Sequence, residues 1–457
     1  MKGLHWDITK KCNLRCKHCY NADKYFNSNA SDFSCIDELN LDEGKKVIDK
    51  IHEQGFAVIH FLGGEPLASE NIFELIKYAK SYGMEVSLNS NATLLDETTQ
   101  EKLIELNVDR FSASIDGATA ITNDAIRGND VFKKVCNNMK SLNKKIIQRN
   151  STMQTSIVSV LTKANQHELH MLPKLVNELG CKLLVLSAFI ESGNGKSNIN
   201  TYQVEENYDT MLDEIEELVK NQLLSTGIYL QLDLRPLVAE YLKNKYNAPV
   251  IHNPMNDLCP AGEDLLYLEA DGLVHPCLVY RMDSGKKAIA SGELIYQETK
   301  LLENDFEKII TNNYWTTFIQ KKNNFNKANI KTCKNCQYST VCTPCPFDYD
   351  SYNLSIDACE WVYKRMQKDI KEMNNKTIKI SPNVTFENNY IYIYERKVLI
   401  NEVTKDFINI ISAKSTSFSN IVLNISQIYN VDTERLEKEL LMLVFKLKNI
   451  GIIKIEE

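Results

Sequence analysis

The chain has 457 residues, of which 43% are hydrophobic and 25% charged, and its formal net charge is −7 at pH 7. This composition is typical of a soluble globular protein, and the length predicts about two to four domains. The negative charge gives no reason to expect nucleic acid as a partner, and no apolar run approaches the roughly 18 residues that cross a bilayer. Because Met1 leads directly into a strand-like segment without a signal peptide, we expect a cytoplasmic protein that binds neither nucleic acid nor a membrane.

Residues 1 to about 240 alternate short apolar runs with amphipathic stretches. The runs are rich in β-branched or aromatic residues, as buried parallel strands are. The six expected strands are Leu4–Thr9, Ala57–Leu62, Glu85–Ser90, Arg110–Ile115, Thr155–Leu161 and Leu183–Phe189. One expected helix begins after Asn40, a plausible N-cap with Glu43 three positions on. Six β/α repeats predict an α/β fold, a partial (β/α)6 barrel of the TIM type, whose chemistry lies at the carboxyl ends of the strands.

Three cysteines follow the first expected strand with the spacing C-x3-C-x2-C, namely Cys12, Cys16 and Cys19. Three thiolates suit an iron–sulfur cube with one open iron, whereas a structural zinc site normally closes with four protein ligands. From the spacing alone, a zinc knuckle and buried thiols remain the alternatives. The chain has thirteen cysteines, and in a reducing cytoplasm they predict metal binding rather than disulfides.

The second expected strand ends in Gly63-Gly64-Glu65-Pro66. Two glycines allow the backbone to approach a ligand closely, although the tetrapeptide alone is as typical of a plain strand-to-helix turn. In combination, C-x3-C-x2-C after the first strand and Gly-Gly-Glu-Pro after the second resemble the radical S-adenosylmethionine (radical SAM) superfamily. The resemblance covers roughly the first half of the chain.

That resemblance implies a [4Fe–4S] cluster held by Cys12, Cys16 and Cys19, with SAM chelating the fourth iron. Reductive cleavage of SAM, with an electron from a donor such as flavodoxin or ferredoxin, yields a 5′-deoxyadenosyl radical that abstracts hydrogen from the substrate. The implied SAM-contacting residues are His18, Gly63, Gly64, Glu65, Asn89, Ser114 and Arg127. Among them, His18 is expected beside the adenine and the Gly64 backbone at the methionyl amine. A solvated histidine, a helix cap and a surface ion pair are the alternatives for His18, Ser114 and Arg127.

Seven further cysteines resemble a SPASM domain, the auxiliary-cluster module of radical SAM enzymes that modify peptides. They are Cys259, Cys277, Cys333, Cys336, Cys342, Cys345 and Cys359, and the last spacer of the four-cysteine run is two residues instead of the usual three. The resemblance implies two auxiliary [4Fe–4S] clusters. Cys333, Cys336, Cys342 and Cys359 would hold one, and Cys259, Cys277 and Cys345 the other. A substrate thiolate, water or another residue would complete the second set, and a zinc ribbon is the alternative for Cys333–Cys345.

The pattern changes again after an expected helix at 360–371. Expected strands are Val384–Glu387, Tyr390–Tyr394, Lys397–Asn401 and Ile452–Ile455, and expected helices are 403–412, 417–429 and 433–449, the last capped by Asp432. This order resembles a winged-helix module and, behind a SPASM domain, the PqqD-like element that binds a precursor's leader by strand addition along its third strand. A DNA-binding winged helix and an oligomerisation module are the alternatives, and the segment is not strongly basic.

The sequence therefore predicts three domains: a radical SAM barrel at 1–240, a SPASM domain at 241–365 and a PqqD-like domain at 378–457. The predicted function is maturation of a ribosomally made precursor peptide, with formation of a cysteine thioether as the expected reaction. Carbon–carbon or carbon–oxygen crosslinking, epimerisation and sulfatase-type formylglycine maturation are the alternatives. Against the last, Leu278 follows Cys277 where the oxidising branch usually has an aspartate.

Overall fold

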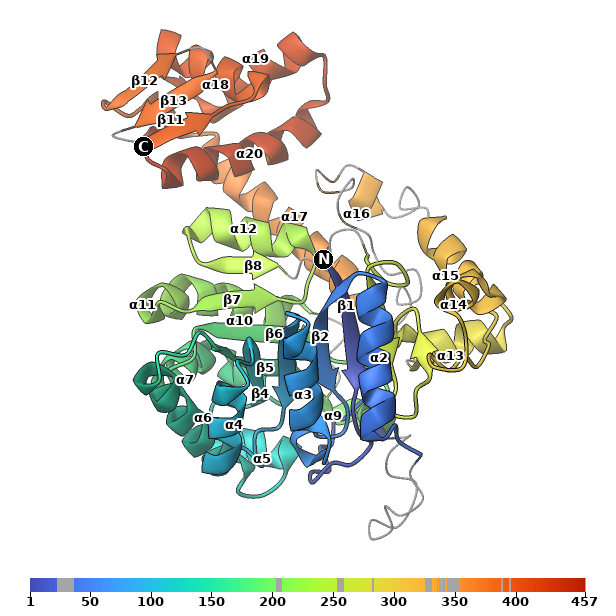
Figure 1. The fold of residues 1–457 in the computed structure, drawn as a ribbon. Helices are drawn as coiled ribbons and strands as arrows, with labels where there is room; N and C mark the ends of the chain where they lie inside the picture. The colour runs from blue at the N-terminus through green and yellow to red at the C-terminus, as the bar shows by residue number, and fades with distance from the viewer. Residues whose placement is uncertain are drawn as a thin grey trace.

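The computed structural model describes residues 1–22, 37–202, 208–252, 259–281, 283–324, 331–334, 336, 338, 342, 353–387, 389–393 and 396–456. Its centre is one sheet in the strand order β10-β9-β1-β2-β3-β4-β5-β6-β7-β8 (Figure 1). The first six strands in the chain are β1 (Lys2–Asp7), β2 (Phe56–Leu62), β3 (Glu85–Ser90), β4 (Arg110–Ser114), β5 (Gln154–Leu161) and β6 (Leu183–Ala188). All pair in parallel with their neighbours in chain order. The six strands expected from the sequence are thus confirmed, within two residues at each end.

The sheet extends beyond those six strands at both edges. At one edge are the short parallel strands β7 (Tyr229–Leu232) and β8 (Val250–His252). At the other, β9 (Leu265–Leu268) pairs in parallel with β1, and β10 (Val274–His275) pairs antiparallel with β9. The expected count of six was therefore too low, because two to four residues are too short for a periodicity to be recognised. A division at 240/241 falls inside α12 (Pro236–Tyr246), and the sheet continues past it.

Helices cover the outer face of the sheet (Figure 1). They include α2 (Leu41–Glu53), α3 (Ile72–Ser81), α4 (Glu97–Glu105), α5 (Ala120–Arg127), α6 (Val131–Gln148), α7 (Leu172–Glu178) and α10 (Asp209–Leu218). The predicted start of α2 is confirmed, since Asn40 and Glu43 form a capping box there. Leu4 and Trp6 of β1 are fully buried in the same core as Val47 of α2. Alternation along each strand therefore sends apolar side chains outward to the helices.

The other face of the sheet carries polar side chains. His5 of β1 lies opposite His60 of β2, and their ring centroids are 5.3 Å apart. His60 in turn lies opposite Ser87 of β3, and its Nδ1 is 2.5 Å from the serine Oγ. Burial lowers the pKa of His5 to about 4 and that of His60 to about 3. Both imidazoles are therefore neutral at physiological pH.

The cysteine-rich segment and the C-terminal segment follow the sheet. The first contains α13 (Asp283–Ala290), α14 (Phe306–Thr311), α15 (Asn313–Asn323) and α16 (Lys331–Lys334), and α17 (Asn353–Met373) leads to the second. The C-terminal elements are β11 (Thr377–Ile380), β12 (Val384–Glu387), β13 (Tyr390–Ile393), β14 (Arg396–Leu399), α18 (Glu402–Ala413), β15 (Thr416–Ser417), α19 (Phe418–Tyr429), α20 (Thr433–Asn449) and β16 (Ile453–Glu456). The expected meander β12-β13-β14 and the three expected helices are present. A second sheet, β15-β11-β16, includes β11 and β15, which the sequence did not predict.

The C-terminal unit, drawn in orange and red, contacts the barrel through α20 (Figure 1). This helix packs against α12 and α17, and Asn449 Nδ2 donates a hydrogen bond of 2.6 Å to the backbone oxygen of Asn244. A polar group links α17 to α12: Asp369 accepts from Tyr241 Oη at 2.7 Å and pairs with Lys245 at 3.0 Å. Among the residues that the structure describes, no helix combines the length and the apolar character needed to cross a membrane.

The two histidines predict that the protein without cofactor loses stability as the pH falls from about 6.5 to about 4. The unfolded chain takes up protons in that window while His5 and His60 in the folded protein do not, so acid favours unfolding by at most about 2 kcal/mol per histidine at pH 5. Urea unfolding at pH 7, 6 and 5 measures this slope. The double variant His5→Gln/His60→Gln should flatten it, whereas His167→Gln, at an exposed histidine, should keep it.

Candidate functional site at the carboxyl end of the first strand

The cysteine loop, which we define as residues 8–20, follows β1 and is held from three sides by hydrogen bonds. Backbone bonds run from Gly64 N to Thr9 O (2.8 Å), from Glu65 N to Lys11 O (2.8 Å) and from Lys17 N to Ile126 O (3.0 Å). The short helix after β6, α8 (Gly193–Ser197), adds Asn194, whose backbone N–H donates to Cys19 O at 2.9 Å and whose Nδ2 donates to Cys16 O at 3.0 Å. The loop therefore has a fixed course over the carboxyl ends of neighbouring strands.

The structure brings the three thiols of this loop together. Burial raises the pKa of the Cys12 thiol to about 11 and that of Cys19 to about 12, and each thiolate disfavours ionisation of its neighbours. Burial also raises the pKa of Cys16, while the nearby Arg127 opposes that rise. Three thiols that resist ionisation in the empty protein need a cationic partner to become thiolates, which is what a metal centre provides.

These thiols do not form a site for one ion: among the described residues, no three His, Cys, Asp or Glu side chains are arranged to hold a metal ion together. A cubane binds each cysteine through a different iron and so accepts a wider spacing. The donor set of three thiols on one fixed loop thus fits an iron–sulfur cluster.

Gly63 and Gly64 lie against the cysteine loop, and the expected contact of the Gly64 backbone with SAM stays a prediction. Gly63 has φ +130°, and a Cβ on it would lie 2.6 Å from Thr9 O. A Cβ on Gly64 would collide with Lys11 O, since its backbone N–H already donates to the loop. In the described structure, the close backbone approach that the two glycines permit is therefore to the cysteine loop itself. The carbonyl of Gly63 accepts a further bond from Asn21 Nδ2 at 3.3 Å.

Glu65 is fully buried and connects β2 to β3. Its carboxylate accepts from Ser90 Oγ at 2.6 Å, from Asn91 N at 2.7 Å and from Leu67 N at 3.1 Å. Burial raises the pKa of Glu65, and these three donors oppose that rise. Since its oxygens are used within the protein, Glu65 holds the strand ends in place.

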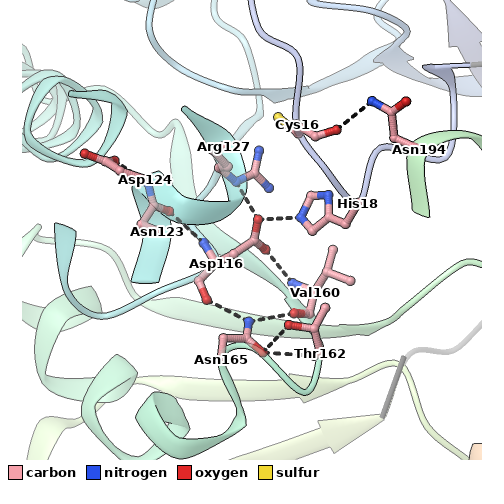
Figure 2. Close-up of polar contacts among 10 residues, drawn as sticks. All are labelled: Cys16, His18, Asp116, Asn123, Asp124, Arg127, Val160, Thr162, Asn165 and Asn194. Carbon is pink, nitrogen blue, oxygen red and sulfur yellow. Dashed lines mark hydrogen bonds and ion pairs between the residues drawn. The ribbon is translucent and has the colours of Figure 1, made fainter. Parts of the chain in front are cut away.

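His18 and Arg127 meet at a residue that the sequence analysis did not single out, Asp116. Figure 2 shows the imidazole and the guanidinium directed at one carboxylate oxygen, Oδ2, with His18 Nε2 and Arg127 Nε each at 2.6 Å. All three residues are buried. Burial alone would raise the pKa of Asp116, but Arg127 and then His18 outweigh it and hold that pKa well below its ordinary value. His18 is thus not a solvated histidine, and the ion pair of Arg127 is not at the surface.

Asn89 and Ser114 lie further along the same edge. Asn89 is on β3, and its Oδ1 is buried without a hydrogen-bond partner among the described residues. Ser114 is the last residue of β4, and the cap of the following helix α5 is Thr119, so Ser114 is not the helix cap. Asn89 therefore offers a hydrogen-bond acceptor near the carboxyl ends of the strands.

The second group of cysteines divides into two places, as far as the structure describes them. Cys336 and Cys359 pack against the same core, and α16, which carries Cys333, contacts α17 near Cys359. Burial, followed by the neighbouring Cys336, Cys342 and Cys333, raises the pKa of the Cys359 thiol well above its ordinary value, so these four thiols lie near the start of α17. Cys259 and Cys277 pack against one small apolar cluster that contains Tyr314 and Phe318. Cys345 and Cys35 lie outside the described residues.

Sequence reasoning missed Asp116, Asn194 and Tyr363. Asp116 stands in the same Ser-Ile-Asp-Gly segment as Ser114, and an acidic residue between two expected functional residues was the available signal. Asn194 follows a glycine-containing turn and gave no signal of its own. Tyr363 lies beside Cys336, which with burial raises the tyrosine pKa, and it is one helical turn after Cys359.

A mostly parallel sheet with three thiols on a loop after its first strand, and with the buried guanidinium of Arg127 beside them, is an α/β fold whose site offers thiol donors for a metal cluster and a cation for a carboxylate. The comparison with known families agrees: residues 6–172 match the model of the Radical SAM superfamily. Residues 6–172 therefore form a radical SAM domain and the protein is an enzyme; an iron–sulfur cluster follows from that superfamily.

The similar proteins include a heme synthase and a maturase. The AdoMet-dependent heme synthase of Nitratidesulfovibrio vulgaris is 23% identical over 365 residues, which are 78% of this chain and 89% of that protein. The mycofactocin maturase MftC of Mycobacterium tuberculosis is 27% identical over 182 residues, 40% of this chain and 43% of that protein.

Among solved structures, Streptococcus suis SuiB bound to S-adenosylmethionine has a TM-score of 0.56 at 13% identity and covers 78% of this chain and 77% of its own. SuiB bound to its precursor peptide SuiA has a TM-score of 0.54 at 15% identity, covering 75% and 70%. At this identity the likeness shows the fold.

The contact between Gly64 and the loop predicts that Gly64→Ala destabilises the protein without cofactor by about 2–3 kcal/mol, because the new methyl group meets backbone atoms that cannot move aside. It should also lower the iron bound after anaerobic reconstitution. Urea unfolding and iron analysis measure the two effects. Gly3→Ala is the control, since its Cβ would make only an ordinary contact of 3.6 Å with Val58; equal losses in both variants would contradict the assignment.

Proposed function

We propose that this enzyme matures a ribosomally made precursor peptide and forms a thioether between a cysteine sulfur and a carbon of the peptide. The observation that supports this most directly is the second group of thiols, with Cys333, Cys336, Cys342 and Cys359 gathered at the start of α17. The resemblance to SPASM enzymes implies that these four thiols, which are separate from Cys12, Cys16 and Cys19, are the ligands of an auxiliary cluster. The likeness to SuiB and MftC adds support.

In this proposal, Cys12, Cys16 and Cys19 hold a [4Fe–4S] cluster, and SAM bound there supplies the radical that removes a hydrogen atom from the peptide. Cys333, Cys336, Cys342 and Cys359 would hold one auxiliary [4Fe–4S] cluster, and Cys259, Cys277 and Cys345 the other. When the sulfur–carbon bond forms, the thiol proton would leave to solvent and the one remaining electron would pass to an auxiliary cluster. An electron donor such as flavodoxin or ferredoxin reduces the enzyme.

The chain's own residues would bind and orient SAM. The side chain of Arg127 is 8% exposed, and no hydrogen bond of its two terminal nitrogens is found among the described residues, which suits the carboxylate of SAM. Asn89 contributes the unpaired Oδ1 to the ribose side, and Ser114 is the last residue of the neighbouring strand β4. Burial of this edge excludes water from the reacting groups.

The C-terminal unit would bind the leader of the precursor. Its strand β14 is an edge strand, so its outer backbone groups are open to a further strand. Ile400 N donates to Asn389 O, and by antiparallel alternation the N–H groups of Lys397 and Leu399 then point away from β13. The side chain of Leu399 is 69% exposed beside them. An extended apolar leader segment can therefore pair with β14.

A second candidate is modification of a tetrapyrrole, favoured by the heme synthase that aligns over 89% of its own length. The two candidates differ in their substrate and not in their radical chemistry. Product analysis separates them.

The first test is co-expression with a short peptide encoded beside the gene for this enzyme, followed by mass spectrometry of that peptide. A thioether predicts a loss of two hydrogens per crosslink and a cysteine that resists alkylation. The Cys12→Ala/Cys16→Ala/Cys19→Ala variant should give unmodified peptide and no 5′-deoxyadenosine. An unmodified peptide from the intact enzyme, together with turnover of an added iron–coproporphyrin, would instead favour the tetrapyrrole candidate.

The second test concerns the edge of β14. Leu399→Pro removes an outward N–H and should weaken leader binding about 10-fold, because one backbone hydrogen bond to the added strand is lost. Phe386→Pro is a matched control, since it removes an outward N–H from the opposite edge strand, β12. Fluorescence anisotropy of a labelled leader measures both. A larger effect of Phe386→Pro would contradict binding at β14.

A further inference from the structure

Both carboxylate oxygens of Asp116 are used within the protein. Its Oδ2 pairs with His18 Nε2 and Arg127 Nε, both at 2.6 Å, and its Oδ1 accepts from Val160 N at 2.9 Å. The backbone is fixed as well, because its N–H donates to Asn123 Oδ1 at 3.0 Å and its carbonyl accepts from Asn165 Nδ2 at 2.6 Å (Figure 2). The residue has no exposed surface. A carboxylate held in this way has one position available to it.

The partners of Asp116 come from three separate parts of the fold. His18 lies in the cysteine loop between Cys16 and Cys19, Arg127 is the last residue of α5, and Val160 is on β5. His18 and Asp116 are 98 positions apart in the chain. One carboxylate therefore determines where the cysteine loop lies relative to the guanidinium of Arg127.

The pairing also determines which nitrogens of Arg127 remain available. Asp116 Oδ2 forms an ion pair with Nε at 2.6 Å that lacks the alignment of a hydrogen bond, and no hydrogen bond of the two terminal nitrogens is found among the described residues. Figure 2 shows this end of the guanidinium on the side of Cys16, and its charge favours the thiolates of Cys16 and Cys19. The two terminal nitrogens form a planar pair of donors, the arrangement that binds a carboxylate through both oxygens.

We propose that Asp116 is a positioning residue for SAM: it holds Arg127 by Nε so that the two terminal nitrogens face the SAM carboxylate, and it fixes the cysteine loop beside them through His18. The inference rests on the proposed role of Arg127 in SAM binding. Asp116 itself does not contact SAM in this arrangement, since both of its carboxylate oxygens are used within the protein.

Glu168 offers a matched comparison in the same region. Its carboxylate is also largely buried and accepts from the backbone of Ala118 and Thr119 and from the hydroxyls of Thr119 and Thr122. It therefore orders the segment before α5, as Asp116 does, but its interactions do not reach Arg127 or the cysteine loop. Removing its charge tests general disruption of this region.

The experiment compares Asp116→Asn, Arg127→Gln, the double variant and Glu168→Gln. The dissociation constant for SAM is measured by equilibrium dialysis on anaerobically reconstituted enzyme, with bound iron determined for each sample. We expect Asp116→Asn to raise Kd about 10- to 100-fold, as loss of an orienting partner does. Compared at equal bound iron, so that any effect through the cysteine loop and its cluster is set aside, the double variant should bind no more weakly than Arg127→Gln alone, because Asp116 then acts through Arg127. Glu168→Gln should stay within about 3-fold of the unmodified enzyme.

Additive effects of Asp116→Asn and Arg127→Gln, or an unchanged Kd in Asp116→Asn, would overturn the proposal. If Asp116→Asn does not fold, Arg127→Lys replaces it: a lysine has one nitrogen for both tasks, so its Kd should rise to that of Arg127→Gln, and an unchanged Kd would refute the mechanism.

A second readout does not depend on SAM or on the cluster. Hydrogen exchange of the peptide covering residues 12–19 in the protein without cofactor should be faster in Asp116→Asn and unchanged in Glu168→Gln. Equal exchange in both variants would remove the proposed link through His18. If the intact enzyme binds no SAM, the proposed function fails, and this exchange measurement still decides whether Asp116 holds the loop.

Discussion

The close backbone contact between the end of β2 and the cysteine loop is the constraint on which the site depends. Gly63 and Gly64 lie against Thr9–Lys11 with no room for a Cβ, and the N–H groups of Gly64 and Glu65 bind the loop carbonyls. Hydrogen bonds between backbone groups at this distance leave the loop little freedom. The three thiols can therefore converge before any metal binds, because folding of the barrel has already ordered the loop and no further conformational entropy is lost there.

Buried charge is the second element of the site. Asp116 and Arg127 form a buried pair, and burying charges is costly unless each is matched and hydrogen-bonded. Here the carboxylate is fully satisfied, while the guanidinium keeps its two terminal nitrogens unpaired among the described residues. A satisfied carboxylate beside a guanidinium with unused donors is expected where a carboxylate of a ligand binds those donors. The raised pKa values of Cys12 and Cys19 likewise indicate that these thiols need a cationic partner, such as a metal centre, to ionise.

The C-terminal unit and the cysteine-rich segment meet at α17. This helix carries Cys359 near its beginning, packs against α10 and α12 of the barrel, and contacts α20 of the C-terminal unit. Lys438 of α20 lies over the ring of Tyr363, with its Nζ 5.0 Å from the centroid, and Tyr363 lies beside Cys336. A peptide held at β14 and the thiols at the start of α17 therefore belong to elements that share one helix as their support.

The amino-acid sequence by itself determined the elements and the ligand types. Short apolar runs rich in β-branched or aromatic residues located β1 to β6, and the Asn40–Glu43 capping box located α2. The spacing of Cys12, Cys16 and Cys19, together with Gly63–Pro66, indicated the superfamily. These features are local, so that a few neighbouring residues suffice to recognise them. Whether the seven later cysteines bind clusters remains a prediction.

Tertiary structure alone decided how distant residues are combined. It placed Asp116 between His18 and Arg127, paired β9 with β1 across more than half of the chain, and set α20 against α12. It also directed Gly64 to the cysteine loop. Each of these contacts depends on strand order and on the path of the chain between segments, and neither leaves a periodic or spaced pattern in the sequence.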